Sequence, residues 1–211
     1  MEFKDWDPIY KEILQDFGWS REEDEKAAIQ LSSLLSGKTS DLSILKKKLE
    51  GKDVLVCGNA LTLSNELDKI NTDRYIIIAA DGATSTLLEK GIIPDIIVTD
   101  LDGYIPDEIE ANRKGAIMVV HAHGDNMKRL GAVKEMKDVF GTTQAAPLAN
   151  IYNFGGLSDG DRGVFLAHSF GARSITLAGF NFKDEKVTYT KKKKLKWALK
   201  LIGFMPGIIK S

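Results

Sequence analysis

Short apolar runs alternate with helical segments from Lys52 onward, and this alternation is the feature that most constrains the fold. The runs are nearly continuous in Ile, Val, Leu and Ala, and they read DVLVC, YIIIAA, DIIVT, AIMVV and SITLA. Strands of this kind are typical of a parallel sheet that is covered on both faces. Right-handed crossovers between alternating strands and helices build a doubly wound sheet. The sequence therefore predicts a Rossmann-like α/β fold with a doubly wound, mostly parallel sheet.

The first 50 residues carry helical patterns and no credible strand. Apolar stripes with helical spacing lie before Gly18, before Gly37 and within residues 40–50, so three helices are expected. Ser20 and Glu23 have the spacing of a capping box for the second helix. We expect these helices to form an N-terminal cap without chemistry of its own.

Composition therefore divides the chain into three predicted parts: an N-terminal helical region (1–50), an α/β catalytic domain (51–185) and a basic C-terminal helical tail (186–211). The tail contains KKKKLKWALKLI. We interpret it as a solvated helix that packs Trp197 and Leu201 against the body. A contact with anionic lipid or with a partner is the alternative.

Charge and cysteine content exclude several classes of protein. The 211 residues hold 29 Lys and Arg against 30 Asp and Glu, so no global basic field indicates a nucleic-acid partner. The single cysteine, Cys57, excludes an intramolecular disulfide framework and a thiolate zinc cluster. No apolar run approaches the roughly 18–20 residues that span a bilayer, and the N-terminus does not resemble a signal peptide. We expect a cytoplasmic protein without a membrane span.

Polar residues follow every predicted strand. Ligands of open α/β sheets bind beyond the carboxyl ends of the strands, where these residues converge. Five such ends predict a polar site. The candidate residues are Gly58 and Asn59, Asp81 and Gly82, Asp100 and Asp102, His121, His123 and Asp125, and Asn181.

The carboxylates narrow the chemistry of this site. Asp100 and Asp102 are one residue apart, so in an extended stretch they point the same way, and Asp81 and Asp125 are expected to join them. Carboxylates at close quarters repel one another, and a hard divalent cation such as Mg²⁺ removes that repulsion. We therefore predict that these four are catalytic and that Asp81, Asp100 and Asp102 bind the metal. The alternative is that Asp100 and Asp102 only cap a turn.

Glycine-rich and histidine-containing segments add weaker evidence. The first turn, GNA, lacks the dinucleotide fingerprint, and the chain has no Walker phosphate loop, so simple NAD binding is disfavoured. In NFGGLSDGDRG, Asp161 and Arg162 either bind substrate groups or pair with neighbours and fix the loop. His121 and His123 make a poor zinc set, and one of them is expected to hydrogen-bond a phosphate or to position Asp125.

The motif DGA at 81–83, followed by GIIPDIIVTDLDG at 91–103, resembles the signature of thiamin pyrophosphokinases. Thr99 replaces a glycine of that signature, and Gly103 replaces a serine. HAHGDN stands where thiamin kinases have D-x-T-D. These departures, together with NFGGLSDGDR, are more similar to the related archaeal 6-hydroxymethyl-7,8-dihydropterin pyrophosphokinases, the MptE-like family. The resemblance covers roughly residues 52–182.

The resemblance implies a catalytic domain like that of thiamin pyrophosphokinases, with Mg²⁺ as cofactor. It also implies transfer of a diphosphoryl group from ATP to the primary hydroxyl of a pterin in folate or methanopterin biosynthesis, with release of AMP. On this view Arg162 or Lys128 stabilises phosphate charge. Asp161 or Asn181 contacts the donor-rich edge of the pterin, or the adenine and ribose. The partners implied are ATP and a small-molecule alcohol, and a homodimer is one assembly that the resemblance allows.

Three alternatives remain open from the residues. A thiamin pyrophosphokinase performs the same reaction on a different alcohol, and a nucleotide-binding regulatory domain keeps the fold without turnover. A glycosyltransferase is the third, because D-x-D after an apolar strand can hold a metal and a sugar nucleotide. The motif around Asp81 and the G-x-x-P-D spacing argue against this last class.

Overall fold

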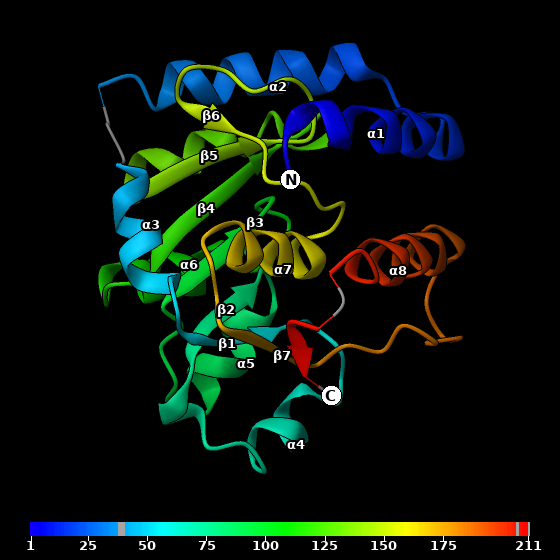
Figure 1. Ribbon diagram of the computed structural model, residues 1–211. Coiled ribbons are helices and arrows are strands. Elements are labelled where there is room, and N and C mark those ends of the chain that lie inside the picture. The colour runs from blue at the N-terminus through cyan, green and yellow to red at the C-terminus, as the bar shows by residue number, and fades with distance from the viewer. Residues whose placement is uncertain (38–40, 206, 211) are drawn as a thin grey trace.

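A single parallel sheet organises the molecule. In the computed structural model, which describes residues 1–37, 41–205 and 207–210, eight strands are ordered β6-β5-β4-β3-β2-β1-β7-β8 (Figure 1). Every neighbouring pair of these strands is parallel. The strands are β1 (Asp53–Cys57), β2 (Ile76–Ala80), β3 (Ile96–Thr99), β4 (Ile117–Ala122), β5 (Val139–Thr143), β6 (Ile151–Tyr152), β7 (Ser174–Ala178) and β8 (Ile209–Lys210).

Helices connect the strands and cover both faces of the sheet, which confirms the doubly wound α/β prediction. The α-helices are α1 (Phe3–Phe17), α2 (Arg21–Leu34), α3 (Leu42–Leu49), α4 (Leu63–Leu67), α5 (Ala83–Glu89), α6 (Ile105–Arg113), α7 (Asp159–Ser169) and α8 (Tyr189–Ile202). Short 3₁₀ helices are η1 (Thr72–Arg74), η2 (Gly124–Asn126) and η3 (Leu130–Glu135). Among the described residues, no helix has the length and apolar character needed to cross a membrane.

The strand order places a switch point beside β1. The chain runs from β1 through β2 and β3 outward to β6, and then returns to β7 on the other side of β1. The connections on the two sides of β1 therefore diverge at its carboxyl end. Ligands of open sheets bind in the crevice that such a divergence leaves. The topology thus points to the ends of β1, β2, β3 and β7 as the place for a site.

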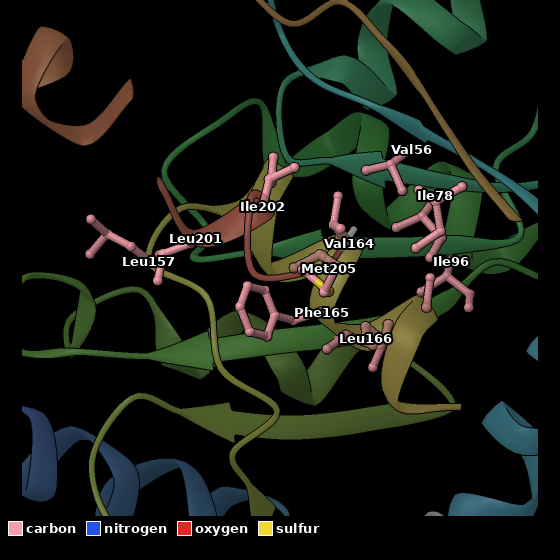
Figure 2. Packing of buried hydrophobic residues seen from close by; sticks show 14 of the residues in the cluster. Val56, Ile78, Ile96, Leu157, Val164, Phe165, Leu166, Leu201, Ile202 and Met205 are labelled. Atoms are coloured by element: carbon pink, nitrogen blue, oxygen red, sulfur yellow. The ribbon is translucent and has the colours of Figure 1, made fainter. Parts of the chain in front are cut away.

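Two hydrophobic cores lie on opposite faces of the sheet. One core contains buried residues of α1, α3, α7 and α8, and the other contains those of α2, α4, α5 and α6. Figure 2 shows part of the first core, in which Val164 and Phe165 of α7 and Ile202 of α8 belong to the same cluster as the sheet residues Val56 and Ile78. Each buried side chain of this size stabilises the fold by about 1.5–3 kcal/mol.

The N-terminal helices are part of both cores. Trp6 and Tyr10 of α1 are buried with the α7 side of the sheet, whereas Leu31 of α2 is buried on the opposite side. Helix α1 ends at Gly18, whose φ of 70° is left-handed, as the sequence predicted. The three-part division of the chain stays a prediction, but these helices share their hydrophobic contacts with the sheet.

Three local predictions have different outcomes. The capping box of Ser20 is wrong, because its side chain makes no capping hydrogen bond and Glu23 binds Lys26 instead, at 2.9 Å. The third helix was expected from residue 40, which lies outside the described residues, and α3 begins at Leu42. The C-terminal tail does pack on the body: Leu201 is fully buried, and Trp197 donates to Asp16.

Candidate active site

Three carboxylates meet at the ends of two neighbouring strands. Asp81 follows β2, while Asp100 and Asp102 follow β3, and one oxygen of each lies within 4.8 Å of the others. Asp81 is buried and Asp102 is exposed. Asp125 does not belong to this group; it is exposed in η2, after β4. The structure therefore brings together three of the four predicted acids.

The loop that carries Asp100 and Asp102 is a turn, so the prediction of an extended stretch is wrong. Between them Leu101 has a φ of 64°, a left-handed conformation that is strained for a residue with a side chain. Thr99 stabilises the turn: its hydroxyl accepts from the Leu101 N–H at 2.8 Å and donates to Asp81 Oδ1 at 3.3 Å. Asp102 N–H donates to Asp100 Oδ1 at 3.2 Å. The convergence of the acids thus comes from this turn.

Gly103 gives Asp81 the space that it occupies. The backbone N–H of Gly103 donates to Asp81 Oδ1 at 3.1 Å. A Cβ atom at residue 103 would lie 2.2 Å from that same oxygen, a distance that real contacts do not show. A serine at this position therefore requires the Asp81 carboxylate to move, so the glycine that replaces the serine of the thiamin signature is linked to the position of Asp81.

His123 holds the second carboxylate in its charged form. His123 Nδ1 accepts from the Asp125 N–H, so in the neutral ring Nε2 carries the proton and donates to Asp100 Oδ2 at 3.2 Å. Burial acts to raise the pKa of Asp100, but the hydrogen bond from His123 and the charge of Arg162 are among the effects that outweigh it and lower that pKa to about 2. Asp100 is therefore an anion at neutral pH.

The other acids of the site repel one another. Burial raises the pKa of Asp81 far above its usual value, and the neighbouring carboxylates of Asp102 and Asp159 raise it further. Burial and the charge of Asp100 raise the pKa of Asp159 in the same way. A cation that binds among these groups lowers the pKa of both Asp81 and Asp159, because it favours the ionised carboxylates.

Glu108 is a buried acid that the sequence interpretation missed. It lies on α6 with only 1% of its surface exposed, and neither carboxylate oxygen has a hydrogen-bond partner among the described residues. Burial raises its pKa, and Asp81 and Thr99 are among its neighbours. Its position was detectable, because Glu108, Ala111 and Asn112 form one buried stripe with helical spacing.

A cavity of about 340 Å³ opens in front of the carboxylates. Gly58, Asn59, Gly82 and Asn181, all predicted from the strand ends, line it together with the three acids. Gly58 also allows a close approach of two loops, since a Cβ there would lie 2.6 Å from the Gly179 carbonyl oxygen. The predicted residues that follow β1, β2, β3 and β7 thus share one cavity, whereas His121, His123 and Asp125, predicted at the end of β4, do not line it.

Asp161 and Arg162 hold the glycine-rich loop together. Asp161 is fully buried and accepts from the backbone N–H groups of Leu157 and Ser158, at 2.6 and 2.9 Å. Arg162 donates to the Leu157 carbonyl at 2.8 Å and to Asp159 at 3.1 Å. Neither residue lines the cavity, whereas Asp159 does. The geometry therefore matches the interpretation in which this pair fixes the loop.

A second cavity of about 230 Å³ lies between the α1–α2 turn and the loop after β4. Trp19 and Glu23 line it from the first segment, and His123 and Asp125 line it from the second. Lys194 of α8 lines both cavities. Neither the N-terminal helices nor the basic tail was expected to reach a site. Lys128, which was considered for phosphate binding, is exposed and lines neither cavity.

The fold and the site define a doubly wound α/β protein with a carboxylate cluster beyond β2 and β3. The family model described as 6-hydroxymethylpterin diphosphokinase MptE-like matches residues 28–187. The chain belongs to the MptE-like family, as its motifs indicated.

Curated relatives agree with this assignment over nearly the whole chain. A Pyrococcus furiosus protein is 44% identical over 97% of this chain and 94% of its own. A Methanothermobacter thermautotrophicus protein is 42% identical over 90% and 83%, and a Methanocaldococcus jannaschii protein is 38% identical over 97% and 96%. Each is named 6-hydroxymethyl-7,8-dihydropterin pyrophosphokinase.

One solved structure shares the fold. The MAf glycosyltransferase from Magnetospirillum magneticum AMB-1 superposes with a TM-score of 0.54 over 90% of this chain. The two sequences are 16% identical, and the matched part is 36% of the glycosyltransferase chain. This likeness describes the architecture alone, because one fold supports many activities.

Proposed function

We propose that this protein is an Mg²⁺-dependent diphosphokinase that transfers the diphosphoryl group of ATP to 6-hydroxymethyl-7,8-dihydropterin. One observation carries the proposal: Asp81, Asp100 and Asp102 converge within 4.8 Å at the switch-point end of the sheet, in a chain of the MptE-like family. The names of the three relatives supply the pterin.

The residues present fit a magnesium ion. Asp81, Asp100 and Asp102 offer oxygen ligands only, which Mg²⁺ prefers, and their mutual repulsion falls when a cation binds. A bound Mg²⁺ supplies charge neutralisation to the phosphates. Asp100 is ionised before a cation binds, because its hydrogen bond to His123 helps to lower its pKa. Thr99 and Gly103 keep Asp81 in place through their bonds to Oδ1.

The larger cavity has the lining that a nucleoside triphosphate needs. Gly58, Gly82 and Gly160 line it, and the space that a Cβ would need at each of them is taken by another lining residue, namely Gly179, Asn59 and Phe180 respectively. Phe180 and Phe182, with ring centroids 5.5 Å apart, offer an apolar surface for a base. We place ATP in this cavity, with its phosphates toward the carboxylates.

The reaction follows from this placement. The hydroxyl oxygen of the pterin forms a bond to the β-phosphorus of ATP, and the bond from that phosphorus to the α,β-bridging oxygen breaks. AMP leaves with the bridging oxygen, and the hydroxyl proton passes to a carboxylate of the cluster. Catalysis of this kind depends on positioning and on charge stabilisation. Lys194, which lines the cavity, supplies a cation for the phosphates.

AMP formation from ATP and Mg²⁺ tests the proposal, with 6-hydroxymethyl-7,8-dihydropterin and thiamin offered separately. We expect AMP with the pterin alone. AMP with thiamin alone would keep the chemistry and assign the chain to the other branch. No AMP with either acceptor would favour a nucleotide-binding domain without turnover.

Asp102→Asn tests the site itself. Asp102 is exposed, so the variant is expected to fold normally and to lose at least about a hundredfold in turnover, a loss typical of groups that stabilise transition-state charge. Glu110→Gln is the matched control, because Glu110 is an exposed acid on α6 that pairs only with Lys114 among the described residues. Normal turnover in Asp102→Asn would remove this residue from the metal site.

A further inference from the structure

We propose that the smaller cavity, between the α1–α2 turn and the loop after β4, binds the heterocycle of the acceptor. The inference rests on the proposed function and assigns the second substrate to a place of its own. It follows from the position of the cavity, its charge and its aromatic wall, and from the way its walls are fixed.

The position of the cavity suits an acceptor. His123 lines it and also bonds Asp100 of the carboxylate cluster, with 3.2 Å between His123 Nε2 and Asp100 Oδ2. Lys194 lines both this cavity and the larger one. The two cavities therefore share Lys194, and the His123–Asp100 hydrogen bond links their linings, so a hydroxyl bound in one is expected to reach a phosphate bound in the other.

The charge of the lining separates the two substrates. Glu23, Asp24 and Asp125 line the smaller cavity, and Lys194 is the one cation among its lining residues. Such a wall repels a polyphosphate but favours a neutral ring that carries N–H donors. A pterin has an amino group beside a ring N–H, an edge that a carboxylate accepts from with two oxygens. The carboxylate of Asp125 has no ion pair or hydrogen bond within the described part of the chain, so both of its oxygens are available.

An aromatic wall offers the surface for a flat ring. Trp19 lines the cavity and stacks on Phe17, with ring centroids 4.3 Å apart and an interplanar angle of 21°. The Lys194 ammonium lies 5.6 Å from the centroid of the Trp19 ring. Because the Trp19 indole is half-buried and already packs against Phe17, it loses little conformational entropy when a heterocycle stacks on it.

A buried hydrogen-bond network fixes the wall before any ligand arrives. The Asp24 carboxylate accepts from the Tyr10 hydroxyl at 2.6 Å, from Gln144 Nε2 at 2.7 Å and from the Gly124 N–H at 2.9 Å. These bonds join α1, α2, the end of β5 and the loop after β4. Asp24 is therefore a positioning residue, and Asp125, whose carboxylate has no partner there, is the group that contacts the ligand.

Steady-state kinetics of Asp125→Asn tests the inference, with ATP and the pterin varied separately. We expect KM for the pterin to rise at least about tenfold, as for the loss of a charged hydrogen-bond acceptor, while KM for ATP stays within about twofold. Mn²⁺ affinity, measured by paramagnetic resonance, is expected not to change. Glu25→Gln is the matched control: Glu25 is an exposed acid on the same helix as Glu23, and it lines neither cavity.

Trp19→Phe and Trp19→Ala give an independent measurement. Phenylalanine keeps a stacking surface, so pterin affinity should fall further in Trp19→Ala than in Trp19→Phe, with ATP affinity equal in both. An unchanged KM for the pterin in Asp125→Asn, or a rise in KM for ATP instead, overturns the inference and leaves the proposed function standing. If the wild-type protein does not convert the pterin, both this inference and the proposed function are wrong.

Discussion

Thr99→Val tests how the carboxylates of the proposed metal site are held in place. Thr99 is fully buried, and valine has nearly its shape, so the change removes a hydroxyl without opening a cavity. The Leu101 N–H loses its acceptor at 2.8 Å, and Asp81 Oδ1 loses a donor at 3.3 Å but keeps the Gly103 N–H. An unsatisfied buried N–H costs about 1–3 kcal/mol, and the longer bond adds less. We expect the free energy of unfolding to fall by about 1–3 kcal/mol.

Urea unfolding followed by the fluorescence of the three tryptophans measures this loss, at an unchanged slope against denaturant. Thr176→Val is the control, because this half-buried β7 threonine makes no side-chain hydrogen bond within the described residues. Mg²⁺ affinity should fall in Thr99→Val alone, since Asp81 and the left-handed Leu101 lose their common support. A loss below about 0.5 kcal/mol, or one equal to that of Thr176→Val, would refute the reasoning.

Two further predictions concern the metal and the core. Mg²⁺ at a hundred times its dissociation constant should stabilise the fold by about 2.7 kcal/mol, seen as a rise in Tm that EDTA reverses. Asp102→Asn should abolish that rise, and an equal rise in this variant would place the ion elsewhere. Gly163→Val should destabilise by about 1–3 kcal/mol in thermal unfolding, because a Cβ there already lies 3.1 Å from Ile78 and 3.2 Å from Val56. Unchanged stability in Gly163→Val would contradict the direct packing of α7 on the sheet.

The sequence predicted the strands whose apolar character is continuous and missed those that depend on their surroundings. β1, β2, β3, β4 and β7 correspond to the five apolar runs. β5 reads VFGTT, and its Gly141 looks like a turn residue. In the structure, a Cβ there would lie 2.4 Å from the Ile151 side chain and 2.9 Å from that of Leu35 in the segment after α2, so any larger residue would push these side chains aside. That requirement comes from long-range packing, which local pattern does not carry.

The candidate site was predictable where strand order decides it and not where a loop decides it. Asp81 and Asp100 directly follow adjacent parallel strands, so their proximity follows from the sheet. Asp102 joins them only through the left-handed turn at Leu101. Asp125 is turned away, because the Asn126 side chain donates to two backbone carbonyls, at 2.7 Å each, and sets the path of η2. Asp161 caps the start of α7 and is buried there, whereas Asp159 lines the cavity. The sequence alone does not say which of these two acids takes which position.

The two departures from the thiamin signature are linked by one atom. The Thr99 hydroxyl donates to Asp81 Oδ1, and a Cβ at residue 103 would lie 2.2 Å from that oxygen. A glycine at 99 would remove a donor from the carboxylate, and a serine at 103 would occupy the space in which the carboxylate sits. Residues that share a partner in this way do not act independently. The replacements at 99 and 103 therefore act together on how the buried carboxylate of Asp81 is held.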